Sequence, residues 1–360
     1  MPNVEETDDA VKSPLLIISY PRTASNLFMR MLSLPDQDDA LSPESGGYFF
    51  YPAIGHMREA GLLDKPPQQW TEEETKTTQL AFQACYDKLQ GLIDTAADQG
   101  KLAVIKEHAP FMMSPTVQSN FVHNRQDLST PWKVAVPNTH SIPNTHSVPN
   151  THSDSEPNTH AVPNLGYPLN ESVLPDHSLL KCTPTFLIRH PALAFPSYYR
   201  VKLAQGMGSE AQDPMNQLVQ ACTLRWTRNL YDWYTFAWEA VTPRKTPPVI
   251  LDADDMLDNP ELVRHFCDYV GLDSTKVRFE WSSISKDDLA NEHPIRRHTR
   301  ATLLTSSGIE RGKTFFGLSV EGEVEKWKDE FGHPAADRLE GWVRAAMPDY
   351  EYLRGRRLVM

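Results

Sequence analysis

The sequence predicts an α/β protein, a single domain in which helices flank a central parallel sheet. Four short apolar runs, at residues 15–20, 102–106, 185–189 and 248–252, have the length of buried strands. Polar or amphipathic stretches separate them, and the helix candidates cover residues 26–34, 72–97, 211–240, 260–270 and 335–347. Buried strands that alternate with helices are typical of a parallel sheet covered on both faces.

Each element has its own signal along the chain. The runs LLIISY, LAVIK, TFLIR and PVILD are each dominated by apolar residues, as expected for strands buried on both faces. The stretch that follows the first run is amphipathic, which favours a helix. The helix at 260–270 is introduced by Asn259-Pro260, and proline is well tolerated in a first turn because its missing N–H is not needed there.

Two segments fall outside this pattern. Residues 1–13 form an acidic tail, and residues 137–164 repeat a motif of Pro, Asn, Thr, Ser and His. Repeated prolines bar regular structure, and the apolar positions are too few to offset the entropy of ordering. We therefore expect a flexible tail and a disordered insertion within a domain of residues 14–360. The histidines of the repeat offer no fixed geometry for a metal ion.

Overall charge and cysteine spacing restrict the function classes. A formal net charge of −12 argues against a nucleic-acid or membrane partner, so an anionic ligand must meet locally placed Arg and Lys. Cys85, Cys182, Cys222 and Cys267 are far apart without a CxxC pair, and we expect reduced, buried thiols. The first apolar run is too short for a signal sequence or a membrane span, and we expect a cytoplasmic protein.

The turn after the first strand has the composition of a phosphate-binding loop. In such a loop, backbone N–H groups at a helix start face the anion, while hydroxyl groups and a cation add donors. A plain turn capped by Ser25 or Asn26 would have a similar sequence. The segment is no Walker A motif, since GxxxxGK[ST] and its lysine are missing. The candidate anion-binding residues are Arg22, Thr23, Ala24, Ser25 and Asn26.

The segment PRTASNLF resembles the loop that binds the 5′-phosphosulfate in the P-loop sulfotransferases, where a proline, a basic residue and a small turn follow the first strand. Three further segments are similar to that family in the same chain order: Lys106-Glu107-His108, Arg189 with Ser197, and, less closely, Arg311 with Lys313. The resemblance implies PAPS (3′-phosphoadenosine 5′-phosphosulfate) as the sulfuryl donor, a hydroxyl or amine acceptor, and no metal.

The resemblance also implies roles for these residues. His108 would be the general base, which suits the chemistry, because the attacking hydroxyl must lose its proton and a neutral imidazole is well matched near pH 7. Arg22 and Lys106 would stabilise the charge on the leaving oxygen. The 3′-phosphate would be held by Arg189 and Ser197 and covered by Arg311 and Lys313.

Two departures from the family pattern affect this loop. The family usually has glycine where this chain has Ala24, and the cytosolic members have lysine where it has Arg22. A methyl group can crowd the backbone approach to an anion. Arginine keeps its charge but cannot give up a proton to the leaving oxygen. Both changes bear on the transfer of the sulfuryl group more than on the binding of the donor.

Apolar residues near His108 are candidates for an acceptor pocket. Phe49, Phe111 and Met112 are placed to line it, and a flexible methionine suits an irregular hydrophobic molecule. Trp226 belongs to an aromatic stripe at helical spacing, which favours core packing with one or two rings reaching the pocket. The sequence thus predicts a small, apolar acceptor molecule as the partner.

Three other functions fit parts of the sequence. The same fold can serve a lyase, cyclase or dehydratase that acts on a small metabolite without turnover of PAPS. Asp252, Asp254 and Asp255 after the fourth strand suggest the Mg²⁺ ligands of a nucleoside or sugar kinase, although the Walker lysine is missing. A protein that only binds could keep the cleft and use the insertion for contacts.

Overall fold

The computed structural model describes residues 12–44, 46–125, 131–136, 169–206, 215–241 and 247–360. The predicted insertion at 137–164 and nearly all of the acidic tail lie outside these ranges. Within the described residues, no helix combines the length and apolar character needed to span a membrane.

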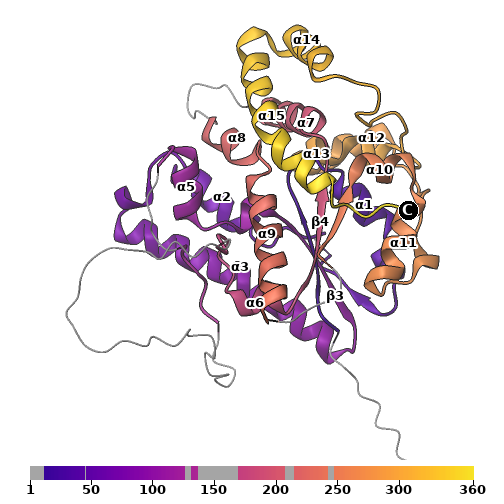
Figure 1. Cartoon of the computed structure of the whole chain (residues 1–360), viewed down its shortest axis with the longest axis horizontal. Helices are drawn as coiled ribbons and strands as arrows, with labels where there is room; N and C mark the ends of the chain where they lie inside the picture. Colours follow the sequence, from indigo (N-terminus) through magenta and orange to yellow (C-terminus); the bar gives the residue numbers. More distant parts are fainter. Residues whose placement is uncertain (1–11, 45, 126–130, 137–168, 207–214, 242–246) are drawn as a thin grey trace, which may run out of the picture.

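A five-stranded parallel sheet forms the centre of the molecule (Figure 1). Its strand order is β2-β3-β1-β4-β5, with β1 at Leu15–Ser19, β2 at Ala40–Leu41, β3 at Leu102–His108, β4 at Thr183–Ile188 and β5 at Val249–Asp252. The four predicted strands correspond to β1, β3, β4 and β5, which confirms the predicted fold class. The sequence pattern missed β2, because two residues are too short to give a periodic signal.

The register of the sheet brings three strand ends to one edge. β1 pairs with β3, where Ser19 lies opposite His108, and with β4, where Ile18 lies opposite Phe186. From β1 the chain passes to the edge strand β2, returns to β3 beside β1, and then crosses to the other side of β1 to form β4 and β5. In open parallel sheets, ligands bind at the carboxyl ends of the strands where the order reverses in this way.

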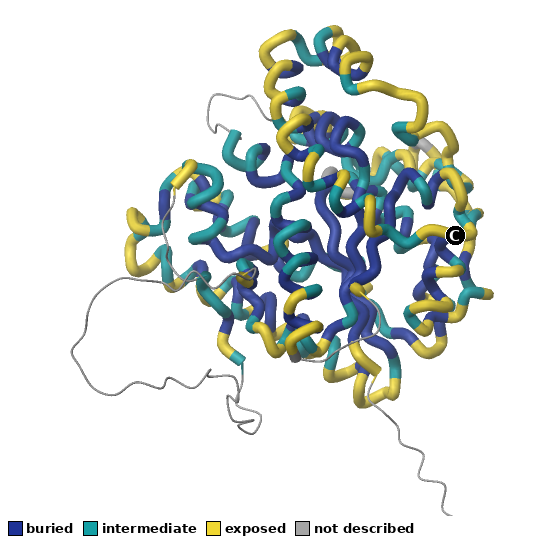
Figure 2. Tube along the Cα trace, in the orientation of Figure 1, coloured by how far each residue is buried: buried dark blue, intermediate teal, exposed yellow. Residues whose placement is uncertain are grey.

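Side chains alternate between the two faces of the sheet and enter two cores. Leu16 and Ile18 of β1 join one hydrophobic cluster, while Leu15 and Ile17 join the other. The alternation follows from the two-residue period of a strand. Figure 2 shows the result, a buried sheet with exposed residues concentrated on the outer helices and loops.

The larger core includes residues of α2 (Tyr51–Glu59), α3 (Glu72–Asp98), α7 (Pro191–Ala204), α9 (Arg225–Val241), α14 (Val320–Phe331) and α15 (His333–Arg354), and of shorter helices. Three helices cover the smaller core, namely α1 (Ser25–Met31), α10 (Ala253–Asp258) and α11 (Glu261–Val270). Figure 1 shows α2, α3 and α9 on one side of the sheet and α1, α10 and α11 on the other. The remaining described helices are α4 (Ala109–Met112), α5 (Pro115–Val122), α6 (Asp176–Leu180), α8 (Met215–Ala221), α12 (Lys286–Asn291) and α13 (Pro294–Thr305).

One predicted helix is divided. The sequence predicted a helix over 211–240, whereas the described part holds α8 and α9 with a break at residues 222–224. The hydroxyl of Thr223 accepts a hydrogen bond from the backbone N–H of Arg225, at 3.1 Å, in the manner of a helix cap. The indole of Trp226 donates to the carbonyl oxygen of Gln220 at 2.8 Å, which fixes the two helices across the break.

Candidate active site

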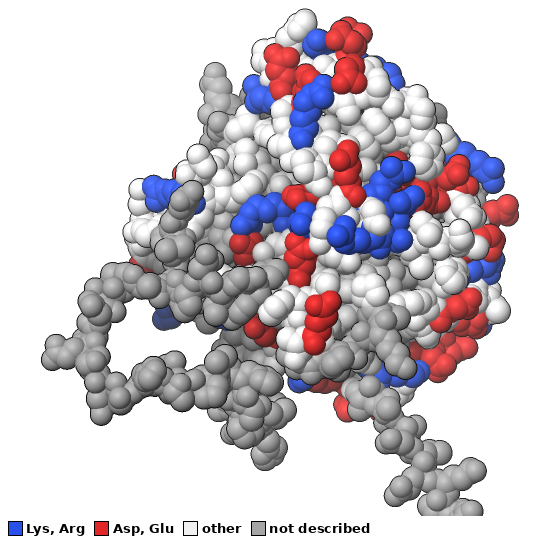
Figure 3. All heavy atoms as spheres, in the orientation of Figure 1, with Lys and Arg blue, Asp and Glu red and all other residues white. Residues whose placement is uncertain are grey.

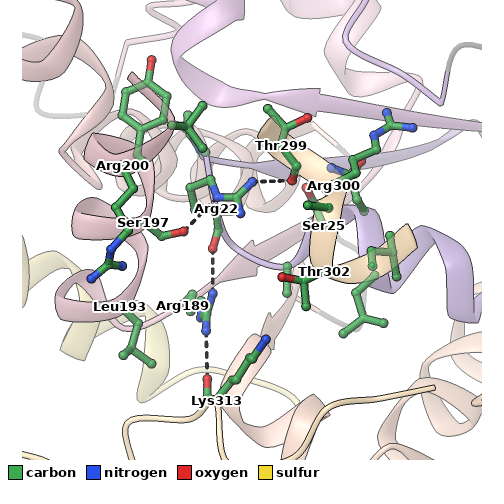
Figure 4. A pocket seen from close by; sticks show the side chains of 18 of the residues that line it. Arg22, Ser25, Arg189, Leu193, Ser197, Arg200, Thr299, Arg300, Thr302 and Lys313 are labelled. Atoms are coloured by element: carbon green, nitrogen blue, oxygen red, sulfur yellow. Dashed lines mark hydrogen bonds between the residues drawn. The ribbon is translucent and has the colours of Figure 1, made fainter. Parts of the chain in front are cut away.

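A cavity of about 670 Å³ opens at the carboxyl ends of β1, β3 and β4. Its walls come from the turn after β1, from α7, from α13 and from the chain around residues 308–318 (Figure 4). Because parallel strands end at the same edge, residues far apart in sequence meet here. Of the predicted site residues, the cavity is lined by Arg22, Ala24, Ser25, Asn26, His108, Phe111, Arg189, Ser197 and Lys313.

The turn after β1 uses two left-handed backbone conformations. Arg22 has a φ of 72° and Ala24 a φ of 58°. An L-residue adopts this region at a cost of roughly 1–2 kcal/mol relative to the right-handed one, and glycine avoids that cost. Thr23 is buried and its hydroxyl donates to the carbonyl oxygen of Tyr20 at 3.0 Å, so this side chain holds the turn from inside. Ser25 stands within hydrogen-bonding distance of the Tyr48 hydroxyl, at 3.1 Å.

Two arginines tie the turn to the rest of the cavity wall (Figure 4). Arg22 donates to the Ser197 hydroxyl at 3.0 Å and to the carbonyl oxygen of Thr299 at 2.6 Å. Arg189 donates to the carbonyl oxygens of Arg22, at 3.1 Å, and Lys313, at 2.8 Å. Burial lowers the pKa of both guanidinium groups, and the positive charge of Arg189 lowers that of Arg22 further.

His108 is oriented by the neighbouring strand. Its Nδ1 lies 2.8 Å from Oγ of Ser19, and that hydroxyl donates to the carbonyl oxygen of Glu107 at 3.3 Å. When the Ser19 hydroxyl donates to this carbonyl, it accepts a hydrogen bond from the N–H at Nδ1, and in that arrangement Nε2 keeps its lone pair. Burial lowers the pKa of His108 well below its usual value, with help from the positive charges of Lys106 and Arg22. The imidazole is therefore neutral at pH 7.

Lys106 supports the loop from behind. Its side chain is 1% exposed, is absent from the cavity lining, and donates from Nζ to Oδ1 of Asn26 at 2.8 Å. The ammonium group also lies 4.2 Å from the ring centre of Tyr48. Burial lowers the pKa of Lys106 to about 7, and the charge of Arg300 lowers it as well. In this structure Lys106 is placed to position Asn26 rather than to contact a ligand.

Several predicted site residues lie away from the cavity. Trp226 is 1% exposed and packs in the larger core, where its ring lies 5.0 Å from the ring of Phe121 on α5 (Pro115–Val122). Phe49 and Met112 line a narrow gap on the other side of β3, beside Leu16. Arg311 is exposed and is not among the lining residues, although Lys313 two positions on is. The structure thus corrects the predicted acceptor wall, of which it retains Phe111.

The cavity is strongly basic although the chain is acidic. Two glutamates line it, Glu310 and Glu323, and each forms an ion pair with a lysine three residues further on. Against these stand eight basic residues, which are Arg22, Arg58, Arg189, Arg200, Lys202, Arg300, Lys313 and Lys326. This is the local cation cluster that an anionic ligand requires.

Sequence reasoning missed Arg58, Lys202, Arg300 and Tyr48. The first three lie on helices and belong to no motif, so only the fold brings them to the cavity. Tyr48 had a signal in the glycine that precedes it. Gly47 has a φ of 108°, and a Cβ there would lie 2.6 Å from the carbonyl oxygen of Lys106. The adjacent N–H of Tyr48 donates to that same oxygen at 2.9 Å, which fixes the tyrosine beside His108.

The aspartates after β5 have protein partners. Asp252 accepts a hydrogen bond from the Tyr350 hydroxyl at 2.8 Å, and Asp254 accepts one from the backbone N–H of Phe315 at 2.9 Å. Asp255 forms an ion pair with Arg357. These bonds tie β5 and α10 to the C-terminal part of the chain, and they account for the three carboxylates in structural terms.

The chain belongs to the sulfotransferase family. It is 37% identical over 351 residues to the sulfotransferase ppzF of Metarhizium rileyi, a match that covers 95% of each chain. The sulfotransferase ppzF of Metarhizium majus is 37% identical over 353 residues, which cover 95% of this chain and 96% of that protein. Among solved structures, the sulfotransferase domain of the Synechococcus PCC 7002 olefin synthase aligns over 92% of this chain and 99% of the domain, with 13% identity and a TM-score of 0.35. No family model matches the sequence.

Proposed function

We propose that the protein transfers a sulfuryl group from PAPS to a hydroxyl group of a small, largely apolar metabolite. The observation that carries the proposal is the meeting of Arg22, Arg189, Ser197 and His108 on one basic cavity at the strand ends. The first three are cation and hydroxyl donors suited to phosphate, and the last is a neutral base. Members of the family use such a set for the donor nucleotide and the acceptor.

The donor fits the side chains that are present. Nε of Arg189 is buried without a hydrogen-bond partner, and the nearest carboxylate oxygen, on Asp254, stands 4.0 Å away. A buried donor without a partner favours a ligand acceptor such as a phosphate oxygen. The cavity volume of about 670 Å³ falls in the range of small-molecule sites. In this proposal Arg189 and Ser197 bind the 3′-phosphate, as the resemblance to the family implies.

The remaining residues divide the chemistry between base and anion stabiliser. When bound, PAPS supplies the sulfuryl group and a phosphate oxygen that keeps the electron pair of the broken S–O bond. Nε2 of His108 takes the hydroxyl proton as the acceptor oxygen bonds to sulfur. Arg22 balances the charge that gathers on the leaving oxygen, and Lys106 acts through Asn26 by fixing the loop.

The test is calorimetric titration with adenosine 3′,5′-bisphosphate, which needs no knowledge of the acceptor. We expect the wild-type protein to bind with a micromolar Kd, about −8 kcal/mol, and Arg189→Ala to weaken binding by about 100-fold, since charge-assisted bonds to phosphate are strong. Arg344→Ala is the matched control, because Arg344 is an exposed arginine paired with Glu340 and Glu321.

Absence of bisphosphate binding by the wild type would overturn the proposal. Where binding is seen, a screen of acceptors with PAPS separates sulfuryl transfer from a lyase or cyclase on the same fold. Sulfuryl transfer consumes one PAPS for each product formed, whereas the other reactions turn over without it.

A further inference from the structure

Two cations on the acceptor side of the cavity are not explained by the donor. Arg58 of α2 lies with its guanidinium carbon 5.9 Å from the ring centre of Phe111 and 6.0 Å from that of Tyr51. The Phe111 ring is in turn 5.1 Å from the ring of His108. Arg58 therefore stands one aromatic ring away from the proposed base.

Lys202 of α7 adds a second charge at the same place. Its Nζ lies 5.6 Å from the ring centre of Tyr198 and donates to Oε1 of Gln217 at 3.0 Å. Burial and the nearby charge of Arg58 lower the pKa of Lys202 to about 7. The charge of Arg58 also opposes the rise that burial gives to the pKa of Tyr198. Arg58, Lys202 and Tyr198 therefore act on one another across the same part of the cavity.

Neither cation has an acidic partner among the described residues. Nε of Arg58 is buried and makes no hydrogen bond, and the two glutamates on the cavity are already paired with Lys313 and Lys326. Two like charges at close range repel, and burial makes each more costly. An anion placed between them would relieve both effects, which no uncharged acceptor can do.

We propose that the acceptor carries a carboxylate or another anionic group, which Arg58 and Lys202 bind while its hydroxyl group meets His108. This inference rests on the proposed function and changes its substrate class, from an apolar molecule to one with an anionic end. Tyr51 and Phe111 would pack against the apolar body between the two ends, since both line the cavity beside Arg58.

The experiment compares hydroxyaryl acids with their own methyl esters. The probes are para-hydroxybenzoate, para-hydroxyphenylacetate and para-hydroxyphenylpropionate, a series that varies the distance between carboxylate and hydroxyl. Each pair is titrated by calorimetry into the full chain saturated with adenosine 3′,5′-bisphosphate. We expect at least one acid to bind about tenfold or more tightly than its ester, because a charge-assisted bond is lost in the ester.

Variants then test whether these two residues cause the preference. In Arg58→Met and in Lys202→Met, which remove the charge but keep an unbranched apolar side chain, the ratio of acid to ester affinity should fall toward one, while the ester binds as before. Arg344→Met, at an exposed ion-paired position, should keep the wild-type ratio. Unchanged bisphosphate affinity in Arg58→Met shows that the fold and the donor site are intact.

The outcomes separate the two proposals. Equal binding of acids and esters by the wild type, no binding of any acid, or a preference that survives both substitutions would each overturn the anionic acceptor. Failure of the bisphosphate to bind would instead remove the donor assignment. The same acid and ester titrations on the protein alone would then still test the site at Arg58 and Lys202.

Discussion

His108 is held by Ser19 through one of its two ring nitrogens. The hydroxyl of Ser19 lies within hydrogen-bonding distance of Nδ1 of the imidazole and of a backbone carbonyl, and this leaves Nε2 as the ring nitrogen for the proposed proton transfer. The two residues face each other across the β1–β3 pair. The register of two strands therefore orients the ring of the proposed base.

The pH dependence of turnover should reflect this environment. Because the folded protein lowers the pKa of His108 well below 6.5, the neutral, active form persists as pH falls through that value. We expect kcat/KM, measured with PAPS and an acceptor from the screen, to stay constant through pH 6.5 and to decline only well below it. His108→Ala should lower kcat by roughly 10²–10⁴ while bisphosphate affinity stays unchanged. An acid limb at or above pH 6.5, or full activity in the variant, would remove His108 from the role of base.

The loop between β1 and α1 combines a strained backbone with a ligand-facing surface. Ala24 precedes α1 in a left-handed conformation, with a φ of 58° and a ψ of 19°. This geometry favours glycine, which reaches the left-handed region without steric cost. The alanine of this chain accepts the conformation at an energetic cost, and the hydrogen bond of Thr23 inside the turn helps to hold it.

Ala24→Gly should therefore stabilise the protein. Removing the strain of a left-handed alanine raises the free energy of unfolding by roughly 1–2 kcal/mol. The greater conformational freedom of glycine in the unfolded chain lowers it by about 0.5–1 kcal/mol. We expect the free energy of unfolding, from urea denaturation, to rise by about 0.5–1 kcal/mol. Ala60→Gly is the control, since Ala60 ends α2 with a φ of −84° and has no such strain to lose. Equal effects of the two substitutions would contradict this account.

The elements that the sequence predicted are those with a continuous local signal. The four longer strands were predicted from their apolar runs, and the helix predicted over 72–97 corresponds to α3, whose start the structure closes with a capping box of Thr71 and Glu74. The break between α8 and α9 was missed because residues 222–224 contain neither proline nor glycine, which are the usual sequence signals for the end of a helix. Elements that depend on a single local hydrogen bond are hard to read from composition.

The residues of the candidate site also differ in how far the sequence could predict them. Arg22, His108 and Arg189 follow three parallel strands directly, so the topology alone brings them together. Trp226 could not be placed in the same way, since an aromatic stripe on a helix looks alike whether it faces core or pocket. Arg58 and Lys202 reach the cavity from helices whose orientation depends on tertiary packing, and no sequence motif indicates them.

At the scale of the molecule, charge is distributed unevenly. The chain has a formal net charge of −12, yet basic residues dominate the cavity. On the face shown in Figure 3, acidic and basic side chains are interspersed. A basic cavity in an acidic protein attracts small anions to one place while the rest of the surface repels extended polyanions.

Removal of residues 137–164 tests how far the site depends on the insertion. The described lining residues pass in sequence from Phe111 to Arg189, with none in between. We therefore expect a variant in which a short Gly/Ser linker replaces 137–164 to bind adenosine 3′,5′-bisphosphate with a Kd within about twofold of wild type, a change of less than 0.5 kcal/mol. Calorimetry provides the measurement, and a loss of tenfold or more would assign the insertion a part in the site.

The hydrogen bonds that Arg22 and Arg189 make to backbone carbonyl groups would compete with the proposed nucleotide. These hydrogen bonds link the turn after β1 to Thr299 of α13 and to Lys313, which both lie in the last quarter of the chain. A phosphate that accepted hydrogen bonds from the same N–H groups would break these links to Thr299 and Lys313. The affinity of the nucleotide would then be a net value. It would equal the free energy of the new charge-assisted bonds less that of the hydrogen bonds between the two segments that they replace.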